Sequence, residues 1–561
     1  MLYNFLTPGI FLILASIPLS FTPKRFYKVV ALILLFSAYF AFCIGMNKWS
    51  FYWYEWFLFS DERVLFILTS IFFLVFLGSM LTSFVEREQT PTNLAMLFVY
   101  VGATISILFT KNLLYILSFL ETMMLAATFI IFSKKDDNSK TEGLNYFRFH
   151  ILGGTLLLIG TMLYYFKYDT FELSLFEKDN FYDASALFIL LGLLINLAAP
   201  PFSSWLLGGY MAAPLSAGLI FIACTTKISA LLMMQLFAGW NSLIFVGIFT
   251  ALYGILYSIF ENNLRRMIFY LVLGELGIFL IFIGIGERIM SAAFIFIIND
   301  LLCIPTLLCS ANFISHFLKK EKISEMKNIF NNSKAVMVLS TMAVFSLTAL
   351  PFTLGYISKK YLYTTDYLAN SYWVTSIIDL LSEGVALCIL FKFTILVFFK
   401  DFSYRRQTDS NVSTLNPKEY WAYICTLTLF YAALFGLTVY FIVLLGIDIV
   451  GFDKFFLKQT QHILIVGAFF LLSRKYLTYS MNMYSFDPNI LYLKAWSCLY
   501  LRLVAITRCL TESSILINFQ AIRKLNWEAR LERWESFADC KGIGWGLTLA
   551  IAILLISLIP F

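Results

Sequence analysis

The sequence predicts an all-α polytopic membrane protein with 14 to 16 transmembrane helices. Of its 561 residues, 60% are hydrophobic and only 13% are charged, whereas a soluble domain carries about 25% charged residues. The apolar residues form continuous runs close to the roughly 20 residues that a helix needs to cross a bilayer. They do not alternate with polar residues as in a membrane β-barrel. These observations exclude a soluble enzyme, a disordered chain and a nucleic-acid-binding protein.

Sixteen apolar segments are expected to span the membrane, and the shortness of the fifteenth leaves any count from 14 to 16 open. In order they cover residues 2–21, 26–46, 64–84, 92–110, 112–133, 146–166, 184–200, 213–238, 242–260, 266–286, 291–316, 335–361, 372–399, 420–446, 461–473 and 542–560. The first segment lacks a basic n-region and a small-residue cleavage site, so we expect a retained span and not a removed signal peptide.

The positive charges predict the orientation of these spans, because Lys and Arg accumulate in cytoplasmic loops. Sixteen alternating spans with both ends outside place most of the 41 Lys and Arg residues inside. The net charge of +7 therefore reflects topology and does not indicate an acidic or nucleic-acid partner. We expect a multi-pass protein of the cytoplasmic (inner) membrane.

Ionisable residues interrupt several apolar segments, where each costs roughly 2.5–3.5 kcal/mol unless it faces protein or water. They are Glu121, Lys227, Glu275, Asp300, Lys359, Lys360, Asp379, Glu383 and Lys392. Lys227 lies near the middle of its segment, and a buried lysine is a natural proton carrier. The alternative for Lys227 and Glu121 is a fixed ion pair that holds two helices together, and Lys359 or Lys360 could instead extend to the interface.

Two segments contain helix breakers at membrane depth. Pro200 and Pro201 follow one segment directly, and Pro351 and Gly355 lie inside another. Irregular backbone at this depth is tolerated only where it is buried in protein or lines a water-filled cavity. Transporters place such breaks near their ion sites, so the breaks favour ion conduction, although proline kinks alone are common.

Four stretches of the chain resemble the antiporter-like membrane proteins, the family of the large proton-pumping subunits of respiratory complex I and of the A and D subunits of Mrp-type cation/proton antiporters. In order they are SFLETMML, NLAAPPFSSWLLGGYMAAPLSAGLIFIACTTK, ENNLRRMIFYLVLGELG and SLTALPFTLGYISKK. The resemblance covers about residues 60–400. It implies two inverted five-helix repeats, spans four to eight and nine to thirteen, with one broken helix in each.

The resemblance also implies an organisation of the whole chain, whose tail looks closest to long proteins that resemble the Mrp D subunit. The segment 474–541 mixes aromatic residues and leucines with Lys and Arg, as helices on a cytoplasmic membrane surface do; a soluble tail is the alternative. The expected parts are N-terminal helices over 1–90, an antiporter-like core over 91–400, C-terminal helices over 401–473, this amphipathic segment over 474–541 and a final helix over 542–561.

The resemblance assigns roles to individual residues. Glu121 matches the family's carboxylate in the fifth helix, Lys227 its eighth-helix lysine, and Lys359 the charge that follows the second break. In the family such groups form a buried chain that exchanges protons as neighbouring charges change, which is coupled titration.

This sequence departs from the family pattern at several of those positions. The central seventh-helix lysine is Asn196, and an amide cannot carry a proton. In the eleventh helix the usual His and Lys align with Asp300 and Ile304, and Glu275 occupies a polar position of the tenth helix. Asp300 and Glu275 could reroute the proton chain, or the subunit could be degenerate.

The resemblance thus implies a membrane subunit of a multisubunit cation/proton antiporter (similar to the Mrp D subunit) or of an NADH:quinone oxidoreductase, translocating protons through Glu121, Lys227, Lys359, Glu275 and Asp300. The alternative is a non-conducting structural paralogue, and a third class is an independent carrier or membrane-embedded transferase. Expected partners are other membrane subunits, the lipid bilayer and H⁺, with Na⁺ or K⁺ left open. No CxxC, P-loop, GxGxxG, Ser-His-Asp or zinc pattern occurs, so we expect no cofactor, metal or catalytic residue in this chain.

Overall fold

The computed structural model describes residues 7–49, 61–86, 89–286, 289–326, 333–363, 372–398, 417–445 and 460–471. This part of the chain consists of helices joined by loops and contains no strand. Eleven of its helices are long and apolar enough to cross a membrane, which confirms the predicted all-α membrane fold. The expected amphipathic segment 474–541 and last span 542–560 lie outside the described residues.

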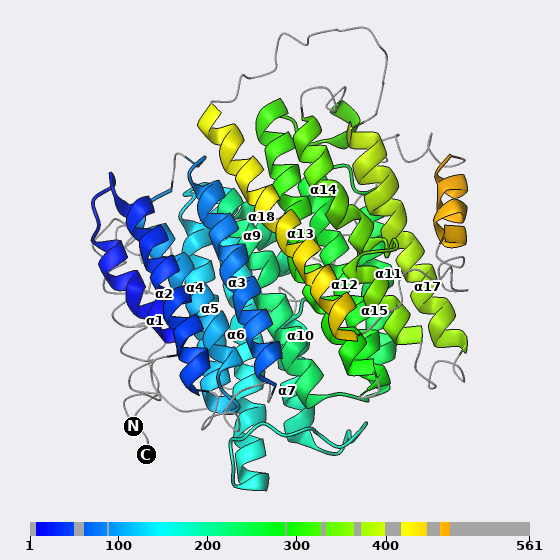
Figure 1. Ribbon diagram of the computed structural model, residues 1–561. Helices are drawn as coiled ribbons and strands as arrows, with labels where there is room; N and C mark the ends of the chain where they lie inside the picture. Colours follow the sequence, from blue (N-terminus) through cyan, green and yellow to red (C-terminus); the bar gives the residue numbers. More distant parts are fainter. Residues whose placement is uncertain are drawn as a thin grey trace, which may run out of the picture. The chain divides into compact units, whose positions relative to one another are not determined.

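Three helices precede the first repeat: α1 (Pro8–Ser20), α2 (Tyr27–Trp49) and α3 (Glu62–Ser83). α1 packs along α4 (Pro91–Leu108) so closely that a Cβ built at Gly9 would clash with the carbonyl oxygen of Gly102. Small residues permit this approach between helix backbones in membranes. In Figure 1 the helices of the N-terminal half, drawn in blue and cyan, stand beside the green helices of the second half.

The first repeat continues from α4 into α5 (Leu113–Phe132), α6 (Asp137–Tyr168), the broken pair α7 (Ala184–Asn196) and α8 (Ser204–Ala212), and the pair α9 (Leu215–Ala223) and α10 (Thr225–Leu236). The second repeat contains α11 (Ser242–Phe260), α12 (Leu264–Ile285), α13 (Met290–Leu318), the broken pair α14 (Lys334–Leu347) and α15 (Leu354–Tyr363), and α17 (Tyr372–Ala386), which continues into the π-helix η5 (Leu387–Leu396). These two sets of helices occupy the positions that the resemblance predicts for the two inverted repeats, and each set contains one broken pair.

Side-chain caps explain where several of these helices begin. Asn112, Asp136, Asp183 and Asn263 each accept a hydrogen bond from a backbone N–H in the first turn of the helix that follows. Such caps pair N–H groups that have no partner within the helix. The four residues therefore set the start of α5, α6, α7 and α12.

The two breaks have the same backbone geometry. In the first, Ala198 has φ of 63° and the Ala199 N–H donates to the Leu194 carbonyl at 3.0 Å. In the second, Ala349 has φ of 54° and the Leu350 N–H donates to the Phe345 carbonyl at 2.9 Å. This is the left-handed helix ending described for Schellman motifs.

Prolines explain why both helices stop at these points. Pro200 and Pro201 lie between α7 and α8, and Pro351 lies between α14 and α15. Proline has no N–H to continue a helix and disfavours helical geometry in the residue before it. Gly355 starts the second half-helix where a Cβ would clash with the Ser346 carbonyl oxygen, so only glycine fits.

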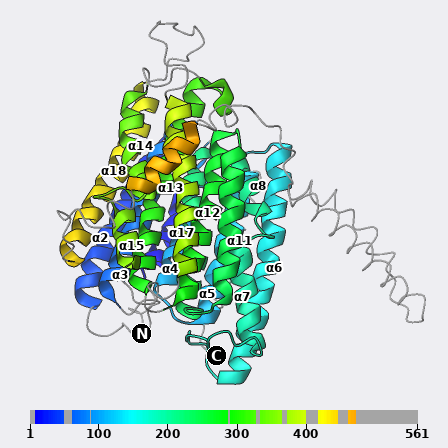
Figure 2. The same cartoon turned by 90° about the vertical axis from the view of Figure 1, so that its right-hand side faces the viewer.

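Burial is highest in the helices that carry Lys227, Glu275 and Asp300. The apolar windows of α9–α10 and α12 are 94% buried and that of α13 is 100% buried, against 28% for α2 and α18 (Pro417–Leu445). α18 runs obliquely across α3 and α13 (Figure 1). The helix Thr460–Leu471 (orange in Figure 2) packs on the α17–η5 helix, where the rings of Phe391 and Phe470 stack with centroids 5.1 Å apart.

Two details differ from the expected continuous spans. The segment 213–238 is interrupted at Cys224, where α9 ends and α10 begins, although no proline marks the position. The segment 372–399 changes from α-helix to π-helix at Leu387. Both changes depend on packing that a hydropathy pattern does not record.

Candidate functional site

A buried ion pair joins the two repeats. Lys227 lies in the first turn of α10, and its Nζ donates to Oδ2 of Asp300 in the middle of α13. The side chains are 1% and 3% exposed. The other oxygen of Asp300, Oδ1, has no hydrogen-bond partner within the described part of the chain. Because an unpaired charge at this depth is costly, the pair is required for either residue to stay ionised.

Glu275 adds a second carboxyl group to this pair. It lies on α12, is 2% exposed, and interacts electrostatically with Asp300, Lys227 and Lys359. Next to Asp300, Asn299 accepts a hydrogen bond from the Ser346 hydroxyl at 2.5 Å, which connects α13 to the last turn before the second break. Two acids and a lysine in one dry cluster can exchange a proton when a neighbouring charge changes.

Glu121 lies apart from that cluster, against α6. A Cβ built at Gly154 would clash with Oε1 of Glu121, so the carboxyl group occupies the space that the glycine leaves open. Over the described ranges, the structure shows no hydrogen bond or ion pair to Glu121, and it does not pair Glu121 with Lys227. Lys227 instead contacts Asp300 on α13.

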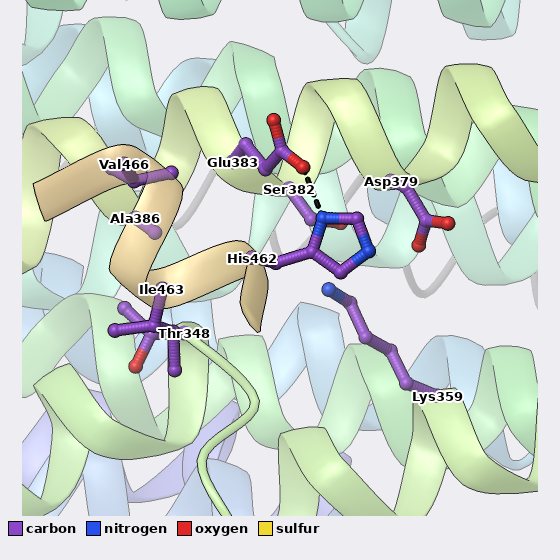
Figure 3. A pocket seen from close by; sticks show the side chains of 9 residues that line it. All are labelled: Thr348, Lys359, Asp379, Ser382, Glu383, Ala386, His462, Ile463 and Val466. Atoms are coloured by element: carbon purple, nitrogen blue, oxygen red, sulfur yellow. Dashed lines mark hydrogen bonds and ion pairs between the residues drawn. The ribbon is translucent and has the colours of Figure 1, made fainter. Parts of the chain in front are cut away.

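Lys359 belongs to a third group of polar residues, which surrounds a cavity of about the size of a water molecule (Figure 3). Lys359 extends from α15 toward the ring of His462, and Nδ1 of His462 pairs with Oε1 of Glu383 on α17. Asp379, also on α17, accepts a hydrogen bond from the Tyr363 hydroxyl. The remaining lining residues are Thr348, Ser382, Ala386, Ile463 and Val466.

The structure also explains Lys392, another ionisable residue inside an apolar segment. Its Nζ donates to the carbonyl oxygens of Ser258 at 2.9 Å, Ile259 at 2.7 Å and Glu261, at the C-terminal end of α11. A lysine there pairs carbonyls that have no partner within the helix and complements the helix dipole. Lys392 thus binds the end of a neighbouring helix.

Sequence reasoning missed two of the three histidines. His150 lies on α6, 4% exposed, with its ring between Tyr146 and Trp205 at centroid distances of 4.2 and 4.4 Å. His462 lines the cavity of Figure 3 and lies on the helix Thr460–Leu471, which corresponds to the short fifteenth span predicted over 461–473. The available signal was the rarity of histidine inside an apolar stretch. Within the described residues, no group of three or more His, Cys, Asp or Glu is placed to hold a metal ion.

Comparisons with known proteins find similarity in the same part of the chain. The family model described as NADH:quinone oxidoreductase/Mrp antiporter, TM, matches residues 110–383. A NADH-quinone oxidoreductase subunit N of Pelagibacter ubique is 27% identical over 302 residues, which are 50% of this chain and 63% of that protein. The A subunit of a Na(+)/H(+) antiporter of Alkalihalophilus pseudofirmus is 23% identical over 373 residues, 60% of this chain and 46% of that protein. The chain thus spans less than two thirds of the length of either relative.

Two solved structures share the fold. A chain of the Mrp complex from Dietzia sp. matches with a TM-score of 0.65 and 16% identity, over 85% of this chain and 55% of that one. A chain of respiratory complex I from Thermus thermophilus matches with a TM-score of 0.62 and 17% identity, over 76% of this chain and 97% of that one. Both matches extend well beyond the region that the family model covers.

Proposed function

Since the chain belongs through residues 110–383 to the NADH:quinone oxidoreductase/Mrp antiporter transmembrane family, we propose that it translocates protons as a membrane subunit of a multisubunit assembly. The assembly is a cation/proton antiporter of the Mrp type or an NADH:quinone oxidoreductase. Its membrane is the cytoplasmic one, its partners are other membrane subunits, and the ion is H⁺, exchanged against Na⁺ or K⁺ in the antiporter case.

The observation that carries this proposal is the cluster of Lys227, Asp300 and Glu275. A purely structural ion pair needs one acid for one base, and replacing such a pair by apolar residues is often neutral or stabilising. A second buried carboxyl group beside the pair adds a further desolvation cost. That cost is expected where the groups exchange protons, since ionisable residues at membrane depth mark ion paths.

The remaining residues extend the path in both directions. Glu121 lies on the side of the first repeat, and Lys359 connects Glu275 electrostatically to the cavity of Asp379, Glu383 and His462. In the proposed mechanism a proton that reaches the cluster weakens the contact between Lys227 and Asp300. Lys227 then releases its proton toward the next group, which is coupled titration along a chain of neighbours.

One observation favours a non-conducting structural subunit instead. Asn196 ends α7 at the first break and is 3% exposed, and its amide cannot carry a proton between Glu121 and Lys227. If nothing replaces that function, the chain holds an assembly together and partner subunits move the ions.

The two functions differ in what they predict for the same pair of variants. The chain is co-purified with its partners, reconstituted in vesicles, and proton movement is followed with and without Na⁺. Proton translocation predicts that both Lys227→Ala and Glu121→Gln abolish movement. Unchanged movement in both variants, with partners still bound, would establish the structural role and contradict our proposal. Dependence on Na⁺ separates the antiporter from the oxidoreductase.

A further inference from the structure

Asn196, which stands where the family pattern has a lysine, lies next to a titratable residue on a neighbouring helix. His150 on α6 interacts with the Asn196 side chain, and both groups are almost fully buried. Nε2 of His150 and Oδ1 of Asn196 have no hydrogen-bond partner in the part of the chain that the structure describes. Buried polar atoms without a protein partner indicate strain, a functional role or a bridging water.

Glu121 on α5 lies against α6 one helical turn from His150. The carboxyl group of Glu121 lies over Gly154, and Gly154 is one helical turn after His150 on α6. Residues four apart share a face of a helix, so the imidazole is the next titratable group along α6 from Glu121. The rings of Tyr146 and Trp205 hold it in place from α6 and α8.

The Trp205 ring is itself fixed by the break. Its Nε1–H donates to the Ile195 carbonyl at 2.9 Å, one residue before Asn196, where the helix ends and carbonyls need partners. The irregular backbone thus orients the aromatic wall beside His150. This explains why the imidazole, the amide of Asn196 and the break lie together.

On the other side, hydroxyl groups lead from His150 toward α10. Tyr146 lies one turn before His150, and its hydroxyl, like that of Tyr210, is fully buried without a hydrogen-bond partner in the described ranges. Both hydroxyls lie near Thr225 without a hydrogen bond to it, and the Thr225 hydroxyl pairs with that of Tyr100. Thr225 begins the helix turn that carries Lys227. Hydroxyl groups can accept one proton and donate another.

The second repeat places an acid one residue away from the corresponding position. The sequence offset that relates Ala198 to Ala349, the left-handed residues of the two breaks, carries His150 to Leu301, the neighbour of Asp300. Asp300 pairs with Lys227. On α13, an ionisable residue therefore directly precedes the position that corresponds to His150.

We propose that His150 replaces the missing central lysine and carries the proton between Glu121 and Lys227, through the hydroxyl groups of Tyr146, Tyr210, Tyr100 and Thr225. This inference rests on the proposed proton translocation. The proton is taken up at Nε2, is released toward the hydroxyl cluster, and leaves the imidazole neutral for the next transfer. Tyr146, Asn196 and Trp205 face the imidazole from α6, α7 and α8, and Glu121 on α5 lies one helical turn away along α6.

The test uses the co-purified assembly in vesicles and compares His150→Gln, His150→Phe and His150→Gln combined with Asn196→Lys. Both single variants remove the proton carrier, and Phe keeps the ring packing, so each is expected to slow proton movement by about tenfold or more. Restoring lysine at 196 is expected to recover most of the rate. His316→Gln, at the end of α13, is the matched histidine control and should move protons at the wild-type rate.

Three results separate this inference from the proposed function. Wild-type rates in both His150 variants, with Glu121→Gln and Lys227→Ala still inactive, would overturn the role of His150 alone. Slow variants that lysine at 196 does not rescue, with a lowered yield of the assembly and a lowered melting temperature, would assign His150 to packing and overturn it too. Wild-type rates in Glu121→Gln and Lys227→Ala would instead contradict proton translocation by this chain.

Discussion

Lys227 and Asp300 form a buried ion pair between α10 of the first repeat and α13 of the second. The contact crosses the boundary between the repeats, so a change in the charge of either residue reaches both halves. Glu275 on α12 interacts with this pair and also with Lys359 on α15. The pair is therefore the junction at which proton transfer in one half affects the other.

Removing one partner of this pair should destabilise the fold more than removing both. Lys227→Met leaves Asp300 buried without its cation, which costs about 3–5 kcal/mol. Combining it with Asp300→Leu removes the unpaired charge, so the double variant should be more stable than Lys227→Met alone. Unfolding of the purified chain in detergent measures this. A double variant less stable than either single variant would show that the two residues do not act as a pair.

Filling the space beside Glu121 should impair proton movement without removing any titratable group. In Gly154→Ala the new Cβ meets the end of the flexible Glu121 side chain, so the carboxyl group is displaced while the helices stay in place. Gly436→Ala on α18 is the control, because nothing lies within 4 Å of its Cβ. Vesicle assays should show a reduced rate for the first variant only. Equal rates in the two variants would show that transport does not depend on the position of the Glu121 carboxyl group.

The ion pair at the start of α7 should make stability depend on acid pH. Asp183 caps α7 and binds Nζ of Lys167 at 2.8 Å. Burial alone would raise the pKa of Asp183, but hydrogen bonds from Lys167 and Ser185 outweigh it and hold the pKa below its ordinary 3.8. The charged carboxylate therefore stabilises the fold above pH 3.8, and this contribution is lost as the pH falls through the lower folded-state value.

The variant Asp183→Asn isolates this charge, since asparagine still caps a helix. Its melting temperature should lie below that of the wild type at neutral pH, and the difference should disappear in strong acid. A difference that is the same at both pH values would assign the effect to the cap and not to the charge.

The contact between His462 and Glu383 should act as one unit in transport. His462→Gln and Glu383→Gln each remove a titratable group from the cavity near Lys359, so each should slow proton movement. Groups that act in one step are non-additive, so the double variant should be no slower than the slower single variant. Rates measured in the same vesicles decide this. Effects that multiply would place the two residues in separate steps.

Much of the fold follows from the sequence because its causes are local. The apolar runs predict the helices. Pro200, Pro201 and Pro351 predict where two of them end, because proline cannot continue a helix. Glu121, Lys227 and Asp300 were visible as charges inside apolar segments, where an unpaired charge is costly. The interruption at Cys224 and the π-helix from Leu387 were not predictable, since neither carries a breaker residue and both depend on packing.

The partners of the charged residues could not be read from the sequence. Lys227 pairs with Asp300 and not with Glu121, because α10 and α13 meet in the fully buried centre. His150 lies in a span whose apolar pattern it hardly disturbs, and its relation to Asn196 exists only once α6 and α7 pack together. The departure at Asn196 was visible, but the residue that we infer compensates for it was not.

The most direct test of the proposed proton path is the initial rate of proton movement in vesicles that contain the assembly with Asp300→Asn. The substitution keeps the size of the side chain and removes only the carboxylate that pairs with Lys227. We expect proton movement to stop while the subunits remain assembled. Wild-type rates in this variant would contradict a proton path through the Lys227–Asp300 pair.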